Sequence, residues 1–176
     1  MNRLGDTRAS QIVELALSLP VLVLFVVGIF DFSNAVTLKQ KLTNAAREGA
    51  RIAASDPASD LAAPIAVPVS VTDAYYVIDS YLKVQQVNDC GLPVPSLSAG
   101  SLTWSSSALC PGGGTLSLSI NRGCMAAENG AVETVNTCVQ IQYPYRWQFG
   151  GVSGLFSNGF MPTTTITTSA ATFNEN

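Results

Sequence analysis

The chain contains no histidine among its 176 residues, and only 12% of its residues are charged. The absence of histidine excludes Ser-His-Asp and Cys-His nucleophilic systems and most zinc enzymes. The net charge of −3 leaves no large basic surface, so we expect no nucleic-acid partner. The carboxylates beyond residue 55 are scattered and form no recognisable acid-base pair. We therefore expect no enzymatic activity and no cofactor.

The chain has no C-x2-C pair, although it contains four cysteines, Cys90, Cys110, Cys124 and Cys138. An even number of cysteines confined to one region favours two disulfides in an oxidising compartment. Three pairings are possible, and we expect the sequential one, which joins Cys90 to Cys110 and Cys124 to Cys138. A zinc site made of all four thiolates is the alternative.

One long apolar stretch dominates the N-terminal part of the chain. Residues 15–30 (LALSLPVLVLFVVGIF) carry no charge, and no turn cluster interrupts residues 10–54. A helix over that range would be about 65–70 Å long, far longer than the roughly 30 Å core of a bilayer. We therefore predict a single helix whose first half lies in lipid and whose second half carries the rest of the chain.

A secretory signal peptide is the alternative interpretation of this stretch. Arg3 and Arg8 precede the apolar run, and a cut after Ala35 would follow small residues. Against that, Glu14 would lie inside the apolar core of such a signal peptide, and a helical pattern continues past residue 35. The basic residues after the run would place the distal part in the cytoplasm, whereas the cysteines place it outside. We favour the location that the cysteines indicate, outside the cytoplasm, because these basic residues belong to an amphipathic helix.

Glu14 and Pro20 interrupt the apolar half. A carboxylate in a membrane helix costs about 2–4 kcal/mol at mid-depth and less near the interface. Glu14 therefore either lies at headgroup level near the positive end of the helix, or it awaits a cationic partner on another chain, such as a new α-amino group. Pro20 removes one backbone hydrogen bond and should kink or loosen the helix.

The second half of the predicted helix is amphipathic. Small apolar residues recur there at helical spacing, at Ala35, Leu38, Leu42, Ala45, Ala46, Gly49 and Ala53. This stripe is expected to pack on the chain's own globular part, on a helix of another subunit, or on both.

The remainder of the chain predicts an α+β fold. Residues 55–68 form a proline-rich linker, and residues 69–87 form a second helix capped by Ser70 or Thr72. A glycine-rich loop is expected at 149–160, and strands are expected at 97–104, 115–121, 134–145 and 162–173. The domains are a leader-like segment (1–9), the long helix (10–54), the linker (55–68) and a disulfide-bonded head (69–176). In that head, the second helix covers an antiparallel sheet of three or four strands.

An ordered set of motifs runs along the long helix. It consists of a small residue, then Glu five positions later, an apolar helix with an internal Pro, an IFDF step and an NAAREGAR end. The chain carries these at Ala9, Ser10, Glu14, Pro20, residues 29–32 (which include Asp31) and residues 44–51. Over residues 8–54 it resembles the TadE family of minor pilin-like proteins from tight-adherence (Flp, type IVc) pilus systems. Residues 143–146 (YPYR) and 165–171 are also similar to that family.

The resemblance implies how the chain is processed and where it goes. A prepilin peptidase would cut between Ala9 and Ser10, although the family usually has Gly where Ala9 stands. Glu14 would then neutralise the amino terminus of an adjoining subunit, with Pro20 and Asp31 in the same assembly helix. The implied partners are other copies or other pilin-like subunits, the membrane before assembly, the peptidase and the pilus platform proteins. The implied location is the inner membrane, single-pass with an extracytoplasmic head, and later a surface filament.

We therefore expect a non-enzymatic, pilin-like subunit, either major or minor, that assembles through its N-terminal helix. The alternative is a signal-anchored extracytoplasmic binding or adhesion module that does not polymerise. Its ligand, a glycan or a surface partner, would lie against aromatic residues, unless these serve core packing: Trp104, Tyr143, Tyr145 and Trp147. A third class, an anchored hydrolase using scattered carboxylates, lacks any motif.

Overall fold

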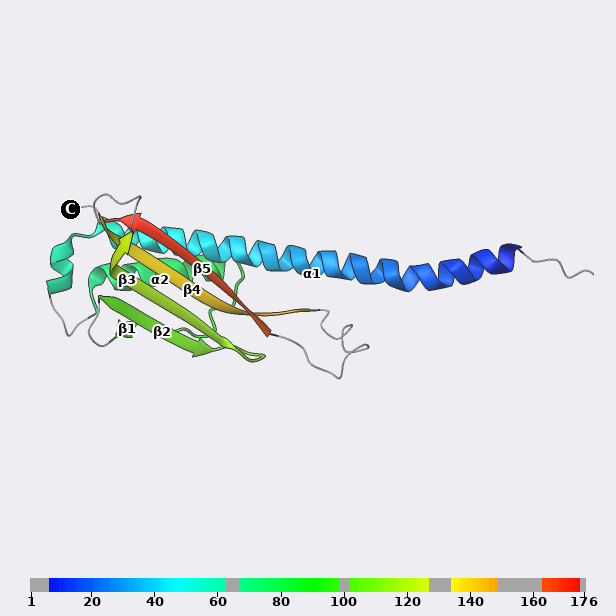
Figure 1. Ribbon diagram of the computed structural model, residues 1–176. Coiled ribbons are helices and arrows are strands. Elements are labelled where there is room, and N and C mark those ends of the chain that lie inside the picture. Colours follow the sequence, from blue (N-terminus) through cyan, green and yellow to red (C-terminus); the bar gives the residue numbers. More distant parts are fainter. Residues whose placement is uncertain (1–6, 63–66, 99–101, 127–133, 149–162, 175–176) are drawn as a thin grey trace, which may run out of the picture. The chain divides into compact units, whose positions relative to one another are not determined.

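The computed structural model describes residues 7–62, 67–98, 102–126, 134–148 and 163–174 (Figure 1). The chain divides into two compact units. One comprises Met1–Val36 and Arg146–Pro162, and the other comprises Thr37–Tyr145 and Thr163–Asn176. Helix α1 (Thr7–Ser55) contributes residues to both units.

The second unit is α+β, as the sequence predicts. After α1 come a short 3-10 helix, η1 (Ala58–Ala62), and helix α2 (Val69–Val84). An antiparallel sheet follows, in which the strands are ordered as they occur in the chain (Figure 1). Its strands are β1 (Ser96–Leu97), β2 (Thr103–Leu109), β3 (Thr115–Ala126), β4 (Thr134–Arg146) and β5 (Thr163–Phe173).

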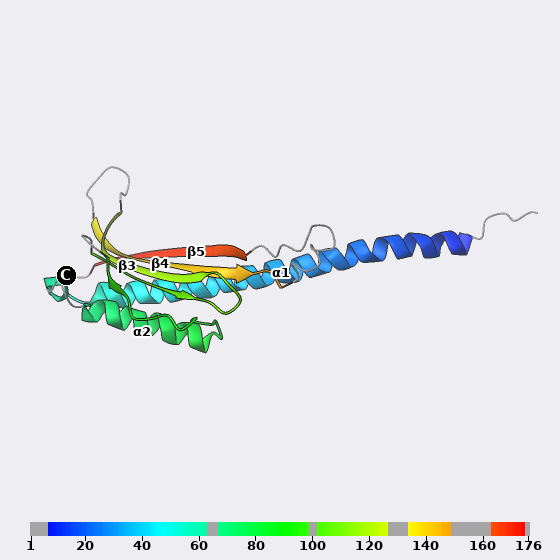
Figure 2. The same cartoon turned by 90° about the horizontal axis from the view of Figure 1, so that it is seen from below.

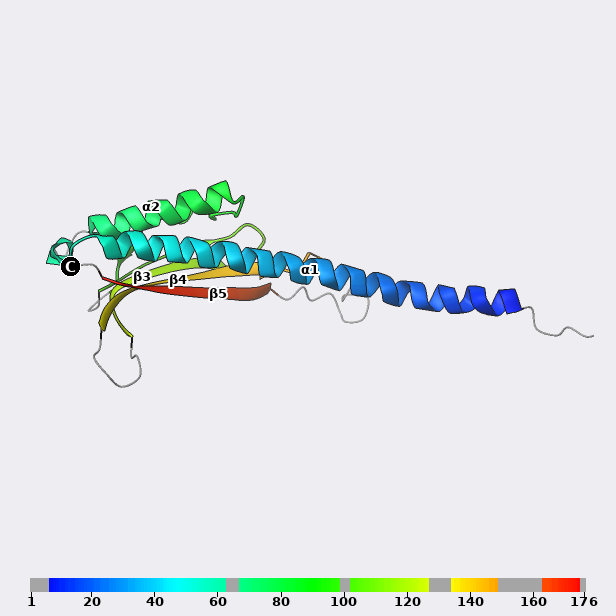
Figure 3. The same cartoon turned by 90° about the horizontal axis from the view of Figure 1, so that it is seen from above.

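The core of this unit lies between one face of the sheet and the two helices. Figures 2 and 3 show α2 and the part of α1 after Val36 on the same side of the sheet. α1 contributes mostly small side chains, α2 larger ones, and the sheet branched and aromatic ones. The fully buried members include Leu42, Ala45, Ala46, Ala50, Ala53, Val71, Ala74, Ile78, Leu82, Leu116, Leu118, Ile120, Val139 and Ile141. Their burial from water is the main term that stabilises the unit.

The sheet has five strands where three or four were expected. The prediction of one strand at 97–104 was wrong, because β1 ends at Leu97 and β2 begins only at Thr103. Sequence TWSSSAL of β2 is rich in serine, which has no strong strand preference and so hides the alternation. In the structure, its Trp104 and Ser106 are buried, whereas Ser105 is half-buried and Ser107 is exposed.

The start of α2 is capped from a distance. Its first backbone N–H groups, those of Val69 and Ser70, donate to the two carboxylate oxygens of Asp60 at 3.2 and 2.9 Å. Neither Ser70 nor Thr72 caps the helix with its side chain, and the Thr72 hydroxyl instead donates to the Pro68 carbonyl. The predicted local cap was therefore wrong, because a carboxylate on η1 already satisfies these N–H groups and the helix dipole.

The end of α2 comes three residues earlier than predicted. The N–H of Gln86 donates to the Lys83 carbonyl, and the N–H of Val87 donates to the Leu82 carbonyl. Gln86 has a φ of 57°, so it occupies the left-handed position that closes a Schellman motif. From α1, Lys41 Nζ donates to the Gln85 carbonyl at 2.9 Å and supplies a positive charge at this helix end.

Two disulfides join the cysteines in sequential order, Cys90 to Cys110 and Cys124 to Cys138. The first links the segment after α2 to the end of β2. The second links the neighbouring strands β3 and β4 beside a register shift between Asn121 and Cys124. Since each sulfur is bonded to another cysteine, none is available as a zinc ligand, and the four-thiolate alternative is wrong. The predicted glycine-rich loop at 149–160 lies outside the described residues.

Candidate assembly site on helix α1

The first half of α1 exposes large apolar side chains all around the helix. The helix contains a stretch with a mean hydropathy of 2.6, none of which is buried, and it is long and apolar enough to cross a membrane. Its most exposed members include Ile12, Leu15, Leu17, Leu22, Phe25, Ile29, Phe30 and Phe32. An apolar surface of this length is unfavourable in water, so it calls for lipid or for other helices around it.

The predicted processing and assembly residues near the start of α1 lie on this same helix. α1 begins at Thr7, so the peptide bond between Ala9 and Ser10 belongs to its first turns. Ser10 and Glu14 are exposed. Within the part of the chain that the structure describes, no hydrogen bond or ion pair reaches the Glu14 carboxylate. A carboxylate in an apolar helix, with no partner among the described residues, is suited to a cationic partner from another chain.

Pro20 does not end the helix, because α1 continues through it to Ser55. Proline has no N–H, however, so the carbonyl of Ala16 loses its usual helical partner. The neighbouring Leu15 carbonyl accepts a hydrogen bond from the Ser18 hydroxyl at 3.1 Å. The kink or loosening expected at Pro20 stays a prediction.

Asp31 differs from the other residues of this half because it is buried, with 6% of its surface exposed. Its carboxylate accepts a hydrogen bond from the backbone N–H of Gln148 at 3.1 Å, a contact within the first unit. A buried carboxylate is costly unless hydrogen bonds compensate for its lost hydration. The structure thus ties Asp31 to the segment that follows β4, and it does not place Asp31 on the exposed surface with Glu14.

Residues 9–51 match the family model described as TadE-like protein. We call these residues the TadE-like segment. It covers nearly all of α1, and the resemblance seen in the motifs is confirmed over this range. No curated protein and no solved structure matches the chain.

The end of the TadE-like segment packs against the chain's own head. Ala45, Ala46 and Ala50 are fully buried there, and Leu38 packs at the edge of the same core. A Cβ added to Gly49 would lie 2.5 Å from Ile78 Cδ1 on α2. The small apolar stripe therefore serves close packing between α1 and α2 within the chain. Packing of the stripe on another subunit's helix stays a prediction.

The charged residues of the same motif face away from that contact. Arg47 and Arg51 are exposed, and Arg51 donates to the Glu48 carboxylate at 2.6 Å, one turn away. The hydrogen bond and the negative charge of Glu48 raise the pKa of Arg51 above its usual value. Exposed ion pairs of this kind add little stability, so these residues form the solvated face of the helix.

A buried arginine on β3 contacts the segment just after α1, and the sequence did not predict this contact. Arg122 on β3 is only 1% exposed, and its Nη2 donates to the Asp56 carbonyl just beyond α1 at 2.9 Å. Burial lowers the pKa of Arg122, while the negative charges of Asp56 and Asp60 act in the opposite direction. The positive charge at the C-terminal end of α1 complements the helix dipole. No local pattern marks it, because its partners are more than 60 residues away in sequence.

The aromatic residues do not form an open site. Trp104 and Tyr145 are buried, and Tyr143 packs against the core. Burial raises the pKa of the Tyr143 hydroxyl, and the charge of Asp89 adds to that effect. The core-packing interpretation is therefore correct for Trp104, Tyr143 and Tyr145, whereas Trp147 is half-buried in the first unit.

Proposed function

We propose that this chain is a pilin-like structural subunit of a Tad/Flp pilus or a related filament, and that it assembles through the first half of α1. One observation carries the proposal: a single helix exposes an apolar first half, while its second half forms the core of a disulfide-bonded head. The match to TadE-like proteins over residues 9–51 supports it. A helix of this kind suits two successive environments, lipid first and neighbouring helices later.

The proposal includes a location for each part of the chain. Before assembly, the apolar half spans the inner membrane, and the head lies on the extracytoplasmic side. Two disulfides support that side, because such bonds persist in oxidising compartments. The partners are other copies or other pilin-like subunits, a prepilin peptidase that cuts before Ser10, and the platform proteins of the pilus system.

Glu14 is the residue on which assembly depends in this proposal. Its carboxylate, which has no partner among the described residues, would pair with the new α-amino group of an adjoining subunit, and the pair would neutralise both charges within an apolar bundle. Glu14→Ala should leave membrane insertion and both disulfides intact but abolish filaments. Glu48→Ala is a matched control, because it removes a carboxylate from the same helix on its solvated face.

The measurement is the yield of sheared filaments from cells, together with chemical crosslinking of the subunit in the membrane. Normal filament yield from Glu14→Ala would contradict the role given to this residue. Crosslinking that finds only monomers in the unmodified chain would favour an anchored module that does not polymerise.

The N-terminal residue of the mature protein tests processing separately. Ser10 at the N-terminus supports cleavage by a prepilin peptidase. Val36 would show that the apolar stretch is a signal peptide and would overturn the proposal. Met1 would leave an uncut anchor, in which no new amino group lies beside Glu14.

A further inference from the structure

The outer face of the sheet carries two ordered rows of short, neutral, polar side chains. Strand pairing places Ser105, Ser119 and Gln140 side by side in one row. It places Ser107, Ser117 and Gln142 in the next. Because side chains alternate along a strand, these residues lie opposite the core residues between them. The six residues therefore form a lattice of hydroxyl and amide groups on the face without helices.

This lattice is the floor and one side of a trough. The cavity has a volume of about 570 Å³, and the segment from Pro93 to Ser96 closes its other side. The serines of β2 and β3 contribute short side chains to the lining, and the two glutamines of β4 contribute longer ones. The volume lies within the roughly 300–1,000 Å³ of typical small-molecule sites.

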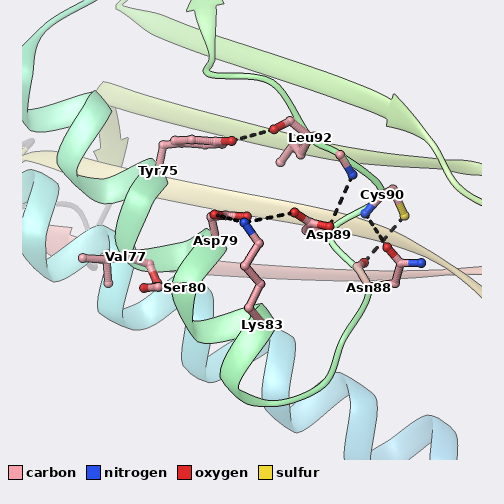
Figure 4. Close-up of polar contacts among 10 residues, drawn as sticks. Tyr75, Val77, Asp79, Ser80, Lys83, Asn88, Asp89, Cys90 and Leu92 are labelled. Carbon is pink, nitrogen blue, oxygen red and sulfur yellow. Dashed lines mark hydrogen bonds and ion pairs between the residues drawn. The ribbon is translucent and has the colours of Figure 1, made fainter.

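The side formed by Pro93 to Ser96 is held firmly by the residues just before it. Cys90 is bonded to Cys110, and the Tyr75 hydroxyl donates to the Leu92 carbonyl. Asp89 accepts from the Gly91 N–H and also pairs with Lys83 at 3.4 Å, while Lys83 pairs with Asp79 (Figure 4). A covalent bond and a polar network therefore hold the segment from Pro93 to Ser96 in place, so the trough is preorganised for a ligand.

The lining of the trough selects for one kind of ligand. None of its described residues is ionisable, so an anion or a cation would lose hydration without gaining a counter-charge. An apolar ligand would cover hydroxyl and amide groups and leave them without hydrogen bonds. A ligand that is itself neutral and rich in hydroxyl groups meets neither penalty.

The side chains that a ligand would contact are free to bind it. Among the described residues, Ser107, Ser119 and Gln140 make no side-chain hydrogen bond. Each serine hydroxyl is one donor and two acceptors, and each glutamine amide supplies both kinds of group. Reciprocal donors and acceptors at regular spacing match the hydroxyl groups along a carbohydrate chain.

We propose that this trough binds a neutral oligosaccharide, with the two serine and glutamine rows contacting its hydroxyl groups. The site lies wholly within the second unit, so it does not depend on the apolar first half of α1 or on assembly. Binding there would give a surface-exposed head a function beyond its structural one.

The test is a titration of the full chain in detergent micelles with a panel of neutral glucose, mannose, galactose and N-acetylglucosamine oligosaccharides. A sulfated oligosaccharide serves as the charged comparison. Ser119→Arg fills the floor of the trough, and Ser80→Arg places the same side chain on the exposed surface of α2. At least one neutral oligosaccharide should bind saturably, Ser119→Arg should weaken it by about tenfold or more, and Ser80→Arg should not.

If Ser119→Arg does not fold, Ser119→Ala and Gln140→Ala test oligosaccharide binding instead, because they remove polar groups without adding bulk. The proposal is overturned if no member of the neutral panel binds, if only the sulfated compound binds, or if the folded trough variants bind normally. Filament yield of Ser119→Arg separates the two proposals. Loss of filaments without any oligosaccharide binding would make the trough a subunit contact and leave the proposed function standing.

Discussion

Gly49 on α1 and Ile78 on α2 lie so close that the glycine has no room for a side chain. An added Cβ would meet both Cγ1 and Cδ1 of Ile78, at 2.6 and 2.5 Å. Gly49→Leu should therefore separate the two helices and lower the free energy of unfolding of the head by about 1–3 kcal/mol. Denaturant unfolding followed by tryptophan fluorescence measures the change.

Gly28→Leu is the matched control for that variant. Gly28 lies on the same helix, but an added Cβ there would meet nothing within 4 Å. The head should unfold at the same denaturant concentration as in the unmodified chain. Equal stability of both variants would contradict the close packing of α1 on α2.

Asp31 makes a second long-range contact, and it is polar. Asp31→Ala removes the acceptor of the Gln148 N–H, so hydrogen exchange at that amide should accelerate by about tenfold, equivalent to roughly 1.4 kcal/mol. Asp31→Asn retains an oxygen acceptor and should show a smaller increase. Mass spectrometry of a peptide covering residues 146–148 reports the rate, with α2 peptides as the internal reference. An unchanged rate in Asp31→Ala would show that this hydrogen bond does not protect the Gln148 amide.

The sequence predicted the features that depend on local patterns. The uncharged run at 15–30 predicted an apolar helix, and the small residues at helical spacing predicted its packed second half. The β-branched residues of the later segments predicted β4 and β5 to within one residue at each end, and they predicted the start of β3, which continues five residues past the expected end at 121. In each case the period of the apolar residues determines which face is buried, so no distant information is needed.

The features that escaped prediction depend on contacts between distant residues. Asp60 caps a helix nine residues away, and Arg122 reaches Asp56 across 66 positions. Gln86 takes a left-handed conformation without the glycine that normally marks a helix end. The hydrogen bond from the Gln148 N–H to Asp31 also joins residues far apart in the sequence, and the assembly role of Asp31 stays a prediction. The serine lattice was missed because polar residues on a strand carry no burial signal.

The left-handed conformation of Gln86 gives a prediction about stability. A side chain with positive φ costs about 1–2 kcal/mol relative to a relaxed backbone, and glycine largely avoids that cost. Gln86→Gly should therefore stabilise the head by about 1 kcal/mol, which a rise in its thermal unfolding midpoint would reveal. Gln85→Gly is the control, because Gln85 has a φ of −80° and gains nothing from glycine. A lower midpoint in Gln86→Gly would contradict the Schellman assignment.

The cap of α2 by Asp60 makes the head sensitive to acid. Burial alone would raise the pKa of Asp60, but hydrogen bonds from Ser70 and Val69 and the charge of Arg122 outweigh it and lower the pKa. A carboxylate whose pKa is lower in the folded state binds fewer protons there than in the unfolded chain. Its contribution is therefore present above the unfolded pKa of about 3.9 and is lost as the pH falls further.

Asp60→Ala removes both the charge and the acceptor, so at neutral pH it should lower the free energy of unfolding by about 0.5–2 kcal/mol. Asp60→Asn keeps an oxygen for the α2 N–H groups and should lose less. Both variants should show a shallower loss of stability than the unmodified chain as the pH falls below about 4, because one titrating group is gone. Asp89 also has a lowered pKa and remains in both variants, so a residual acid dependence is expected. Unfolding curves that keep the full acid dependence in Asp60→Ala would show that other carboxylates, and not this cap, control the response.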